Sequence, residues 1–581
     1  MPDPQLVLAA QVQAALSAAF GPSYADADPV IRPSQFADLQ ANVALPLAKK
    51  LGRKPRDVAD EIVANLDTAG VVSDVQVSGP GFINLTLSDA WIAAEAQRAL
   101  ADERLAVPAV DKPRKVVVEY SSPNVAKEMH VGHLRTTIVG DAIARILAFL
   151  GHDVVRDNHV GDWGTPFGML IEHLLDLGED AAARNDSSVS DLTAFYQAAR
   201  EKFDGDEEFA DRSRKRVVAL QAGDAETLRL WNVLVNVSKR YFNAVYGRLG
   251  VTLTDDDIKG ESFYNDLLAS TAQELEDKGI AVISEGALCA FPPGFAGREG
   301  EPLPVIIRKS DGGYNYSTTD LATIRYRVDT EHVDRMIYVV GAPQSLHFQM
   351  VFAVARMAGW LNDEVRAEHA QIGNVLGTDG KILRTRAGGT VKLAELLDEA
   401  VERAGAVFDE VQHDASFDDA TRAAIVQAVG IGAVKYADLS VARDSEYVFD
   451  FDRMISFNGK TGPYLQYAAA RIRSIFRKGG VSVADATGPI TLGHPAERAL
   501  ALELLGFGAV LKQAGDTAEP HRLASYVYAV ADAYTTFHEN CPVLKAPDEE
   551  TKASRLALCA ATLRTLETGL HLLGVPTPER M

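Results

Sequence analysis

The sequence predicts a multidomain α/β protein with a Rossmann-type parallel-sheet core, a small α/β domain before it and an all-α bundle after it. Between residue 114 and about residue 450, apolar strands alternate with amphipathic helices, which is typical of a doubly wound sheet. From about residue 455 to the end, helical periodicity dominates. The length of 581 residues is enough for roughly three or four domains.

Residues 1–107 form the predicted first domain. Helical spacing of apolar residues occurs at 6–20 and 42–51, and the segments 71–77 and 82–87 are expected to be strands. Basic residues gather at and beyond the end of the second helix: Lys49, Lys50, Arg53, Lys54 and Arg56. The proline-containing segment 106–113 is the expected linker to the core.

The predicted core, residues 114–450, begins with the apolar strand 116–118 and a helix whose apolar residues repeat on one face from Leu134 to Leu150. Its second half contains the segments 335–340 and 371–376. A charged, largely helical insertion of about 170–305 separates the two halves.

Residues 455–581 form the predicted all-α domain. The expected helices are 464–476, 496–514, 523–537 and 552–573. Their strong apolar faces exclude a disordered tail, because such faces must be buried.

The composition argues against a protein coated by nucleic acid. Lys and Arg number 58 against 80 Asp and Glu, a formal net charge of −22, whereas proteins that bind RNA through non-specific charge are usually basic. Cys289, Cys541 and Cys559 are widely spaced, which indicates neither a zinc site nor a disulfide framework and favours the cytoplasm. No apolar run reaches the ~18 residues that span a bilayer, so we expect a soluble protein without membrane contact.

His130-Val131-Gly132-His133 lies at the turn from the first core strand to the following helix. A helix start presents unpaired N–H groups and positive potential, which favour a phosphate. Glycine lets a nucleotide approach the backbone, and the two histidines can donate hydrogen bonds to phosphate oxygens. Taken alone, the motif also fits two ordinary surface histidines.

The residues around this motif resemble those of class I aminoacyl-tRNA synthetases, whose HIGH signature it matches. Ser-Ser-Pro-Asn at 121–124 precedes it, and Asn-His-Val-Gly-Asp-Trp-Gly-Thr follows at 158–165. Together these flanks are similar to those of arginyl-tRNA synthetases. The resemblance covers nearly the whole chain. It implies a class I catalytic core, a helical anticodon-binding domain and an N-terminal domain that contacts tRNA.

The resemblance implies ligation of L-arginine to tRNA(Arg) with ATP, through an arginyl-adenylate, by a protein that we expect to be a monomer. Mg²⁺ would accompany ATP without a dedicated protein cage, and no tightly bound metal is expected. The reaction needs positioning and charge stabilisation at a phosphate, and no protein nucleophile. Two alternatives stay open: a small nucleotidyltransferase, which shares the HxGH chemistry, and a non-catalytic RNA-binding relative.

The second class I element, the KMSKS loop, is degenerate in this chain. The matching segment is Lys-Ile-Leu-Arg-Thr-Arg at 381–386, where Leu383 replaces the central serine and Arg384 the second lysine. Arginyl-type enzymes with such a loop carry a lysine just before the first motif, so Lys127 is expected to supply the missing charge. A solvated basic turn at 381–386 and a solvent-exposed Lys127 are the alternatives.

The resemblance also implies the substrate residues. A guanidinium calls for a carboxylate in a partly dry pocket. The expected arginine site is Glu119, Asn124, His159, Tyr316, Asp320 and Gln344. The expected ATP site is His130, Gly132, His133, Gly341, His347, Lys381 and, through its backbone, Val375. The expected catalytic residues are Lys127, His130, His133, Lys381 and Arg384.

Contacts with tRNA are expected from local basic patches. The candidates are Lys49, Lys50, Arg53, Arg471 and Arg473, and a solvated basic face is the alternative for each cluster. Four aromatic residues of the bundle either stack on anticodon bases or form its core: Tyr526, Tyr528, Tyr534 and Phe537.

Overall fold

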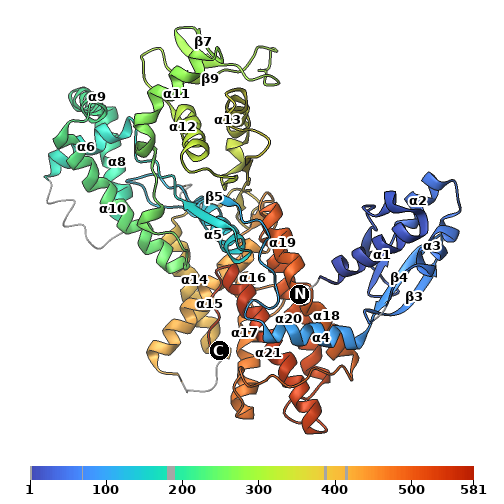
Figure 1. Cartoon of the computed structure of the whole chain (residues 1–581). Helices are drawn as coiled ribbons and strands as arrows, with labels where there is room; N and C mark the ends of the chain where they lie inside the picture. Colours follow the sequence, from blue (N-terminus) through green and yellow to red (C-terminus); the bar gives the residue numbers. More distant parts are fainter. Residues whose placement is uncertain (1–2, 69, 179–189, 385–388, 412–416) are drawn as a thin grey trace.

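The computed structural model describes residues 3–68, 70–178, 190–384, 389–411 and 417–581. Figure 1 shows an N-terminal domain that stands to one side of a larger body, which contains the parallel sheet and the helical bundle. The predicted multidomain α/β fold is therefore confirmed. Within the described residues, no helix has both the length and the apolar character required to cross a membrane.

The N-terminal domain is a four-stranded antiparallel sheet covered by helices. The strand order is β1-β2-β4-β3, with bounds β1 (Ile31–Pro33), β2 (Leu39–Ala41), β3 (Val72–Ser78) and β4 (Phe82–Leu87). The helices are α1 (Pro4–Phe20), α2 (Ala44–Leu51) and α3 (Pro55–Ala64). The sequence prediction missed β1 and β2, because three residues are too few to show an alternating pattern.

The helix that follows joins this domain to the body. Helix α4 (Asp89–Ala101) was predicted as part of the first domain, but it packs against the C-terminal bundle. Arg498 of the bundle lies 2.6 Å from Asp89 at its start, and Arg564 donates to the carbonyl of Leu100 at its end. The helix is therefore clamped at both ends.

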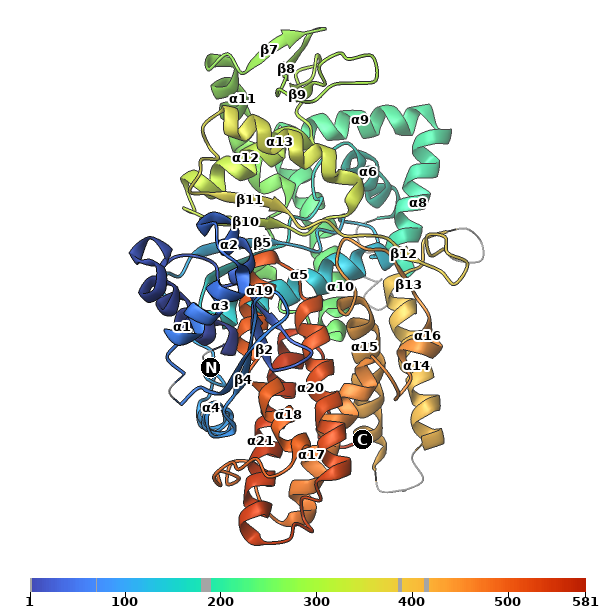
Figure 2. The ribbon, with the colours of Figure 1, turned by 90° about the vertical axis from the view of Figure 1, so that its right-hand side faces the viewer.

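The core sheet is parallel, with strand order β11-β10-β5-β6. The strands are β5 (Lys115–Glu119), β6 (Asp153–Asp157), β10 (Arg335–Tyr338) and β11 (Arg366–His369). Val116 and Val118 face the hydrophobic cluster that contains α5 (Val131–Phe149), whereas Val117 faces the cluster of α12 (Tyr316–Asp329) and α13 (Ser345–Met357). Figure 2 shows these helices on opposite sides of the sheet. The strand order reverses between β5 and β10, and ligands of open α/β sheets bind at that point.

The predicted strand near 371–376 is displaced from this sheet. Residues 366–369 form the fourth strand, whereas β12 (Val375–Leu376) pairs with β13 (Tyr447–Val448) in a separate two-stranded ladder. Strand β11 has no clear signal in the sequence, because it is a half-exposed edge strand of sequence Arg-Ala-Glu-His.

The insertion consists of a helical group and a small sheet. The helices are α6 (Pro166–Leu177), α8 (Ser190–Gly205), α9 (Glu207–Gln221), α10 (Ala225–Leu249) and α11 (Asn265–Asp277). The antiparallel strands are β7 (Ala281–Ser284), β8 (Ala287–Ala290) and β9 (Val305–Arg308). Helix α10 returns to the carboxyl edge of the core sheet, where its side chains meet the loop after β5.

The remaining helices form the lower part of the body in Figure 1. They are α14 (Leu393–Val411), α15 (Asp419–Leu439), α16 (Phe451–Met454), α17 (Gly462–Gly479), α18 (Pro495–Leu504), α19 (Phe507–Thr517), α20 (His521–Asn540) and α21 (Glu549–Leu572). The single helix predicted at 496–514 is wrong, because the chain turns at Gly506. The turn lets both α18 and α19 pack on α20, while α19 also reaches α5.

Candidate active site

His130 and His133 organise the start of α5. Nδ1 of His130 accepts the Gly132 N–H at 3.0 Å, and Nδ1 of His133 accepts the His130 N–H at 3.1 Å. The rings lie 3.9 Å apart between centroids. A Cβ atom at position 132 would lie 2.8 Å from the His130 ring, so glycine is required there by space. The motif is therefore a reciprocal cap of the helix start.

Both histidines present one hydrogen-bond donor to the outside. Burial lowers the pKa of His133 to about 3, with a further contribution from His130. Burial, followed by the charge of Lys127, lowers the pKa of His130. The rings are neutral at pH 7, and since each Nδ1 accepts, each proton is on Nε2. Neither Nε2 is hydrogen-bonded to a described residue, so both suit a phosphate oxygen.

The loop between β5 and α5 has a strained backbone. Ser121, Ser122 and Ala126 have φ angles of 73°, 47° and 60°, in the left-handed region that non-glycine residues rarely adopt. Helix α10 holds the loop: Ser238 Oγ accepts the Ala126 N–H and Tyr241 Oη accepts the Met129 N–H, both at 2.9 Å. The insertion therefore supports the loop that leads into the histidine motif.

Asn124 lies on this loop beside Gly161. The Val125 N–H donates to the Gly161 carbonyl, and the Gly161 N–H donates to the Pro123 carbonyl. A Cβ atom at position 161 would lie 2.4 Å from Asn124 Oδ1. The glycine thus leaves the space in which the Asn124 amide sits at the cleft.

Lys127 is exposed, and its Nζ lies 4.4 Å from the centre of the Tyr196 ring of α8. Ammonium over a tyrosine face is a weak cation–π contact that an anion can compete with. Lys127 lowers the pKa of His130, which places the charge close to the motif. The predicted role of Lys127 toward the phosphates stays a prediction.

The degenerate KMSKS-like loop, residues 381–386, is described as far as residue 384. Lys381 and Arg384 are exposed, whereas positions 385 and 386 of the predicted loop lie outside the described residues. The side chains of Lys381 and Arg384 line a hollow, together with those of Asp379, Glu395, Leu396, Glu399, Phe449 and Phe451. The chain then returns to the histidine motif: the Val131 N–H donates to the Val391 carbonyl, and Lys392 lies 2.9 Å from Glu128.

Asp320, predicted for the guanidinium, is paired with His347, predicted for ATP. Oδ2 of Asp320 lies 2.5 Å from Nε2 of His347, and both side chains are 18% exposed. The exposed Tyr316 ring stands edge-on to His347 at 5.0 Å. The structure therefore brings these three residues into one cluster and does not divide them between two subsites.

The remaining predicted contacts lie along the β10 side of the cleft. Gln344 is exposed at the end of a short 3-10 turn, Ala342–Gln344. Gly341 forms a bridge with Ile372. Val375 is buried, and its carbonyl accepts the Leu383 N–H at 2.9 Å. The adenine contact expected from the backbone of Val375 stays a prediction.

Glu119 ends β5 and is buried beside Asp157, which ends β6. The guanidinium of Arg327 contacts both carboxylates, and the ligand atoms of Glu119, Asp157 and His159 lie within 4.8 Å of one another. Within the described residues this is the one group with metal-ligand geometry. Arg327 already supplies the positive charge there, so the cluster is better described as a buried ion network.

Glu261 also belongs to the cleft, although no sequence pattern indicated it. Burial raises the pKa of its carboxyl to about 7; His159 opposes the rise, and the charges of Asp162 and Asp320 add to it. Perturbed carboxyl groups of this kind cluster at functional sites. Glu261 lies in a short 3-10 turn of the insertion, so only the folded chain reveals its position.

The two predicted tRNA patches differ in structure. Lys49 and Lys50 are exposed at the end of α2, and Arg53 forms an ion pair with Glu61 at 2.6 Å. Arg471 lies over the Tyr467 ring at 4.7 Å. These residues lie on surfaces that RNA could reach.

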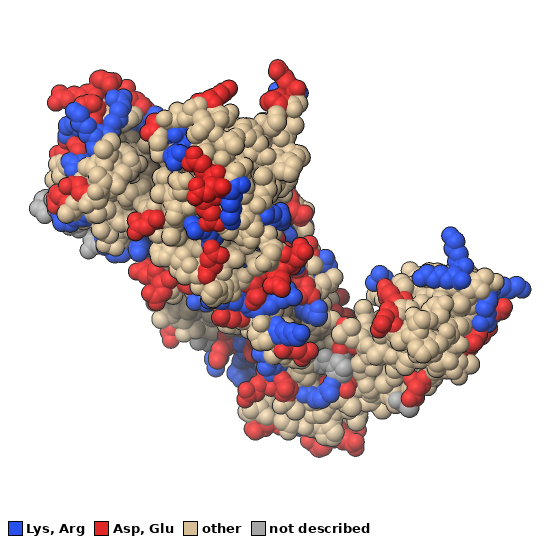
Figure 3. All heavy atoms as spheres, turned by 45° about the horizontal axis from the view of Figure 1, so that its top comes forward, with Lys and Arg blue, Asp and Glu red and all other residues tan. Residues whose placement is uncertain are grey.

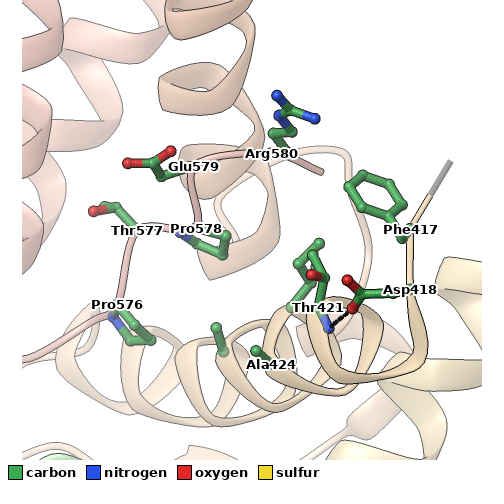
Figure 4. A pocket seen from close by; sticks show the side chains of 11 residues that line it. Phe417, Asp418, Thr421, Ala424, Pro576, Thr577, Pro578, Glu579 and Arg580 are labelled. Carbon is green, nitrogen blue, oxygen red and sulfur yellow. Dashed lines mark hydrogen bonds between the residues drawn. The ribbon is translucent and has the colours of Figure 1, made fainter.

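Arg473 does not fit the predicted contact with tRNA, because its guanidinium N–H groups bind other groups of the protein. Its side chain is 17% exposed and lies 2.5 Å from Glu567, and it donates to the carbonyls of Thr577 and Pro578. It therefore anchors the C-terminal tail. The tail also lines a hollow against the start of α15 (Figure 4). That hollow contains none of the predicted site residues.

The aromatic residues of the bundle are mostly core. Tyr526, Tyr534 and Phe537 are buried, so of the two alternatives these three residues form the core of the bundle. Tyr528 is half-buried. A second hollow between α17 and the chain after α20 does have accessible basic and aromatic groups: Tyr467, Arg471, Arg477, Lys478, His538 and Lys545.

A parallel sheet with a phosphate-suited helix start at its reversal point, followed by a helical domain, fits the class I tRNA synthetases. A family model described as tRNA synthetases class I (R), catalytic domain, matches residues 95–451. Models of the arginyl tRNA synthetase N terminal domain and the DALR anticodon binding domain match residues 6–87 and 465–581.

Relatives cover the complete chain. An arginine–tRNA ligase of Thermobifida fusca is 65% identical over 581 residues, with full coverage of both chains, and one of Frankia casuarinae is 53% identical with 98% coverage of both. The crystal structure of Plasmodium falciparum arginyl-tRNA synthetase matches at a TM-score of 0.84 with 28% identity and full coverage of both chains. The Thermus thermophilus enzyme matches at 0.80 with 26% identity, covering 99% of this chain and 100% of that one.

The chain belongs to the arginine–tRNA ligase family, and it is an enzyme of that family. The alternative of a small nucleotidyltransferase is wrong, because the matches include the N-terminal and anticodon-binding domains.

Proposed function

We propose that this chain activates L-arginine with ATP at the carboxyl edge of its parallel sheet and then transfers the arginyl group to tRNA(Arg). The observation that carries the proposal is the convergence of three groups at the β5–β10 reversal point. The neutral histidine pair at the start of α5 suits phosphate, Asp320 and Tyr316 on α12 suit a guanidinium, and Glu119 at the end of β5 suits an ammonium.

In the first step, an α-carboxylate oxygen of arginine attacks the α-phosphorus of ATP. The bond from that phosphorus to the bridging oxygen breaks, and pyrophosphate leaves with the electron pair. His130 and His133 donate from Nε2 to phosphate oxygens, and Lys127, Lys381 and Arg384 supply positive charge as negative charge builds up. Mg²⁺ enters with ATP and supplies further charge neutralisation.

In the second step, a hydroxyl of the terminal ribose of tRNA attacks the arginyl carbonyl carbon, and AMP leaves with the bonding electron pair. The chain contributes positioning. Basic side chains project from the outer end of the N-terminal domain in Figure 3. Lys49 and Lys50 of this domain are exposed at the end of α2. The hollow beside Arg471 suits unstacked anticodon bases.

We further propose a monomer that acts in the cytoplasm. Its three cysteines are free and buried, which suits a reducing compartment.

The test is ATP–pyrophosphate exchange with arginine, lysine and citrulline, with and without tRNA. Exchange that requires arginine supports the proposal, and exchange with lysine or with no amino acid refutes it. Asp320→Asn should raise the KM for arginine by about a hundredfold, because a partly buried charge partner of the guanidinium is lost. The KM for ATP should rise far less, although Asp320 also contacts His347. Binding of tRNA without charging would instead favour the non-catalytic alternative.

A further inference from the structure

Arg327 lies buried at the floor of the cleft, between the ends of two core strands. Its Nη2 is 2.7 Å from Glu119 Oε2 and 2.9 Å from Asp157 Oδ2. The side chains of Arg327 and Asp157 are 0% exposed, and that of Glu119 is 7% exposed. The guanidinium also lies 5.2 Å from the centre of the Tyr338 ring. These contacts fix the arginine from three neighbouring strands.

With both carboxylates ionised, the cluster carries one negative charge in excess. Burial raises the pKa of Glu119, and the charge of Arg327 is the largest effect that opposes this rise. Glu119 and Asp157 are register partners at the ends of β5 and β6, and Arg327 is the one described cation that forms an ion pair with either. Two carboxylates this close favour protonation of one of them unless a cation lies between them. Two carboxylates and one guanidinium leave a single negative charge, which matches one ammonium group.

The ion pair with Arg327 also orients the carboxylate of Glu119. Oε2 accepts from Arg327, whereas Oε1 accepts no hydrogen bond from the described residues. Asp320 precedes Arg327 by seven residues on α12, so both side chains project from the same side of the helix. Helix α12 thus carries Asp320, which is expected to bind the guanidinium of the substrate. The same helix carries Arg327, which holds Glu119, the carboxylate expected to bind the α-ammonium group.

We propose that Arg327 is a positioning residue that keeps Glu119 ionised and turned so that Oε1 receives the α-ammonium group of arginine. This inference rests on the proposed function, in which Glu119 binds that group. Arg327 also neutralises one of the two strand-end carboxylates. The ends of β5 and β6 therefore keep one negative charge, which is enough to bind one ammonium group. The guanidinium of the substrate is directed to Asp320 instead.

The test compares two ligands that differ only in the α-amino group, L-arginine and 5-guanidinopentanoate, by calorimetric titration of the full chain. Arg327→Gln should weaken L-arginine on the order of tenfold to a hundredfold, because a charge-assisted contact is lost, and 5-guanidinopentanoate by less than about threefold. Arg327→Lys should restore part of the difference, since lysine supplies charge without the planar fork.

A matched control is Arg335→Gln. Arg335 is a buried arginine that lies 2.6 Å from Glu368, but at the amino end of β10. This variant should lose stability without discriminating between the ligands. If Arg327→Gln does not fold, Asp157→Asn and Arg327→Lys test the same point, because each disturbs one side of the pair.

Equal weakening of both ligands by the Arg327 and Asp157 variants would overturn the positioning role and leave Arg327 a structural residue. Failure of the proposed function gives a different result, because the wild-type chain would then bind neither ligand.

Discussion

The raised pKa of Glu261 gives arginine binding a predicted pH dependence. Because the pKa is about 7, about one-tenth of this carboxyl is ionised at pH 6 and about nine-tenths at pH 8. A guanidinium bound beside Asp320 favours the ionised form, so deprotonation and binding are linked. The sign follows from the raised pKa: binding strengthens as the pH rises, and the Kd of L-arginine should fall by about tenfold from pH 6 to pH 8.

The assay is calorimetric titration of the full chain with L-arginine at pH 6, 7 and 8 without ATP. Glu261→Gln should remove the pH dependence, because the amide does not titrate. Glu503→Gln is the matched control: burial also raises the pKa of Glu503, but this residue lies on α18 in the bundle. It should keep the wild-type profile. A wild-type Kd that is constant over this interval, or a slope that persists in Glu261→Gln, would refute the reasoning.

Three further predictions concern the phosphate site and the tRNA patches. His133→Asn keeps an acceptor for the helix cap but removes the Nε2 donor. The kcat of pyrophosphate exchange should therefore fall by about a hundredfold. A fall of less than about threefold would contradict the role of His133 toward the phosphates. Arg473→Gln should lower the free energy of unfolding of the bundle by about 1–2 kcal/mol, measured by denaturant titration, with unchanged tRNA affinity; weaker tRNA binding by a fully stable variant would restore the predicted contact. Lys49→Glu combined with Lys50→Glu should weaken tRNA binding and reduce the slope of log Kd against log salt by about 2; an unchanged slope would show that α2 does not meet the phosphate backbone.

The local features of the catalytic loop were predictable from the sequence. An apolar strand, a glycine between two histidines and an amphipathic helix sufficed to predict a strand-to-helix turn for phosphate, and the structure has that turn as the capped start of α5. These features depend on neighbours in the chain, so short-range rules apply. The resemblance of 121–124 and 158–165 then predicted the family, which the full-length relatives confirm.

Contacts between distant segments were not predictable in this way. The pairing of Asp320 with His347 and the anchoring of the C-terminal tail by Arg473 each join residues more than 25 positions apart. A basic residue on a helix looks the same in sequence whether it faces RNA or a glutamate of a neighbouring helix. The single helix expected at 496–514 failed for the same reason: α18 and α19 both pack on α20, but α18 also meets α4 and α21 whereas α19 also meets α5, and these contacts need a turn between them.

The sequence thus determined most of the longer elements, their order and the strand-to-helix turn of the histidine motif, because periodicity, capping and turn residues act within a few positions along the chain. Only the tertiary structure decided which charged groups form ion pairs inside the protein and which face the cleft. Arg327, Asp157 and Glu261 acquire their roles from burial and from neighbours on other elements. Burial changes the cost of a charge by more than any local sequence preference does, and a chain shows its buried positions only after it has folded.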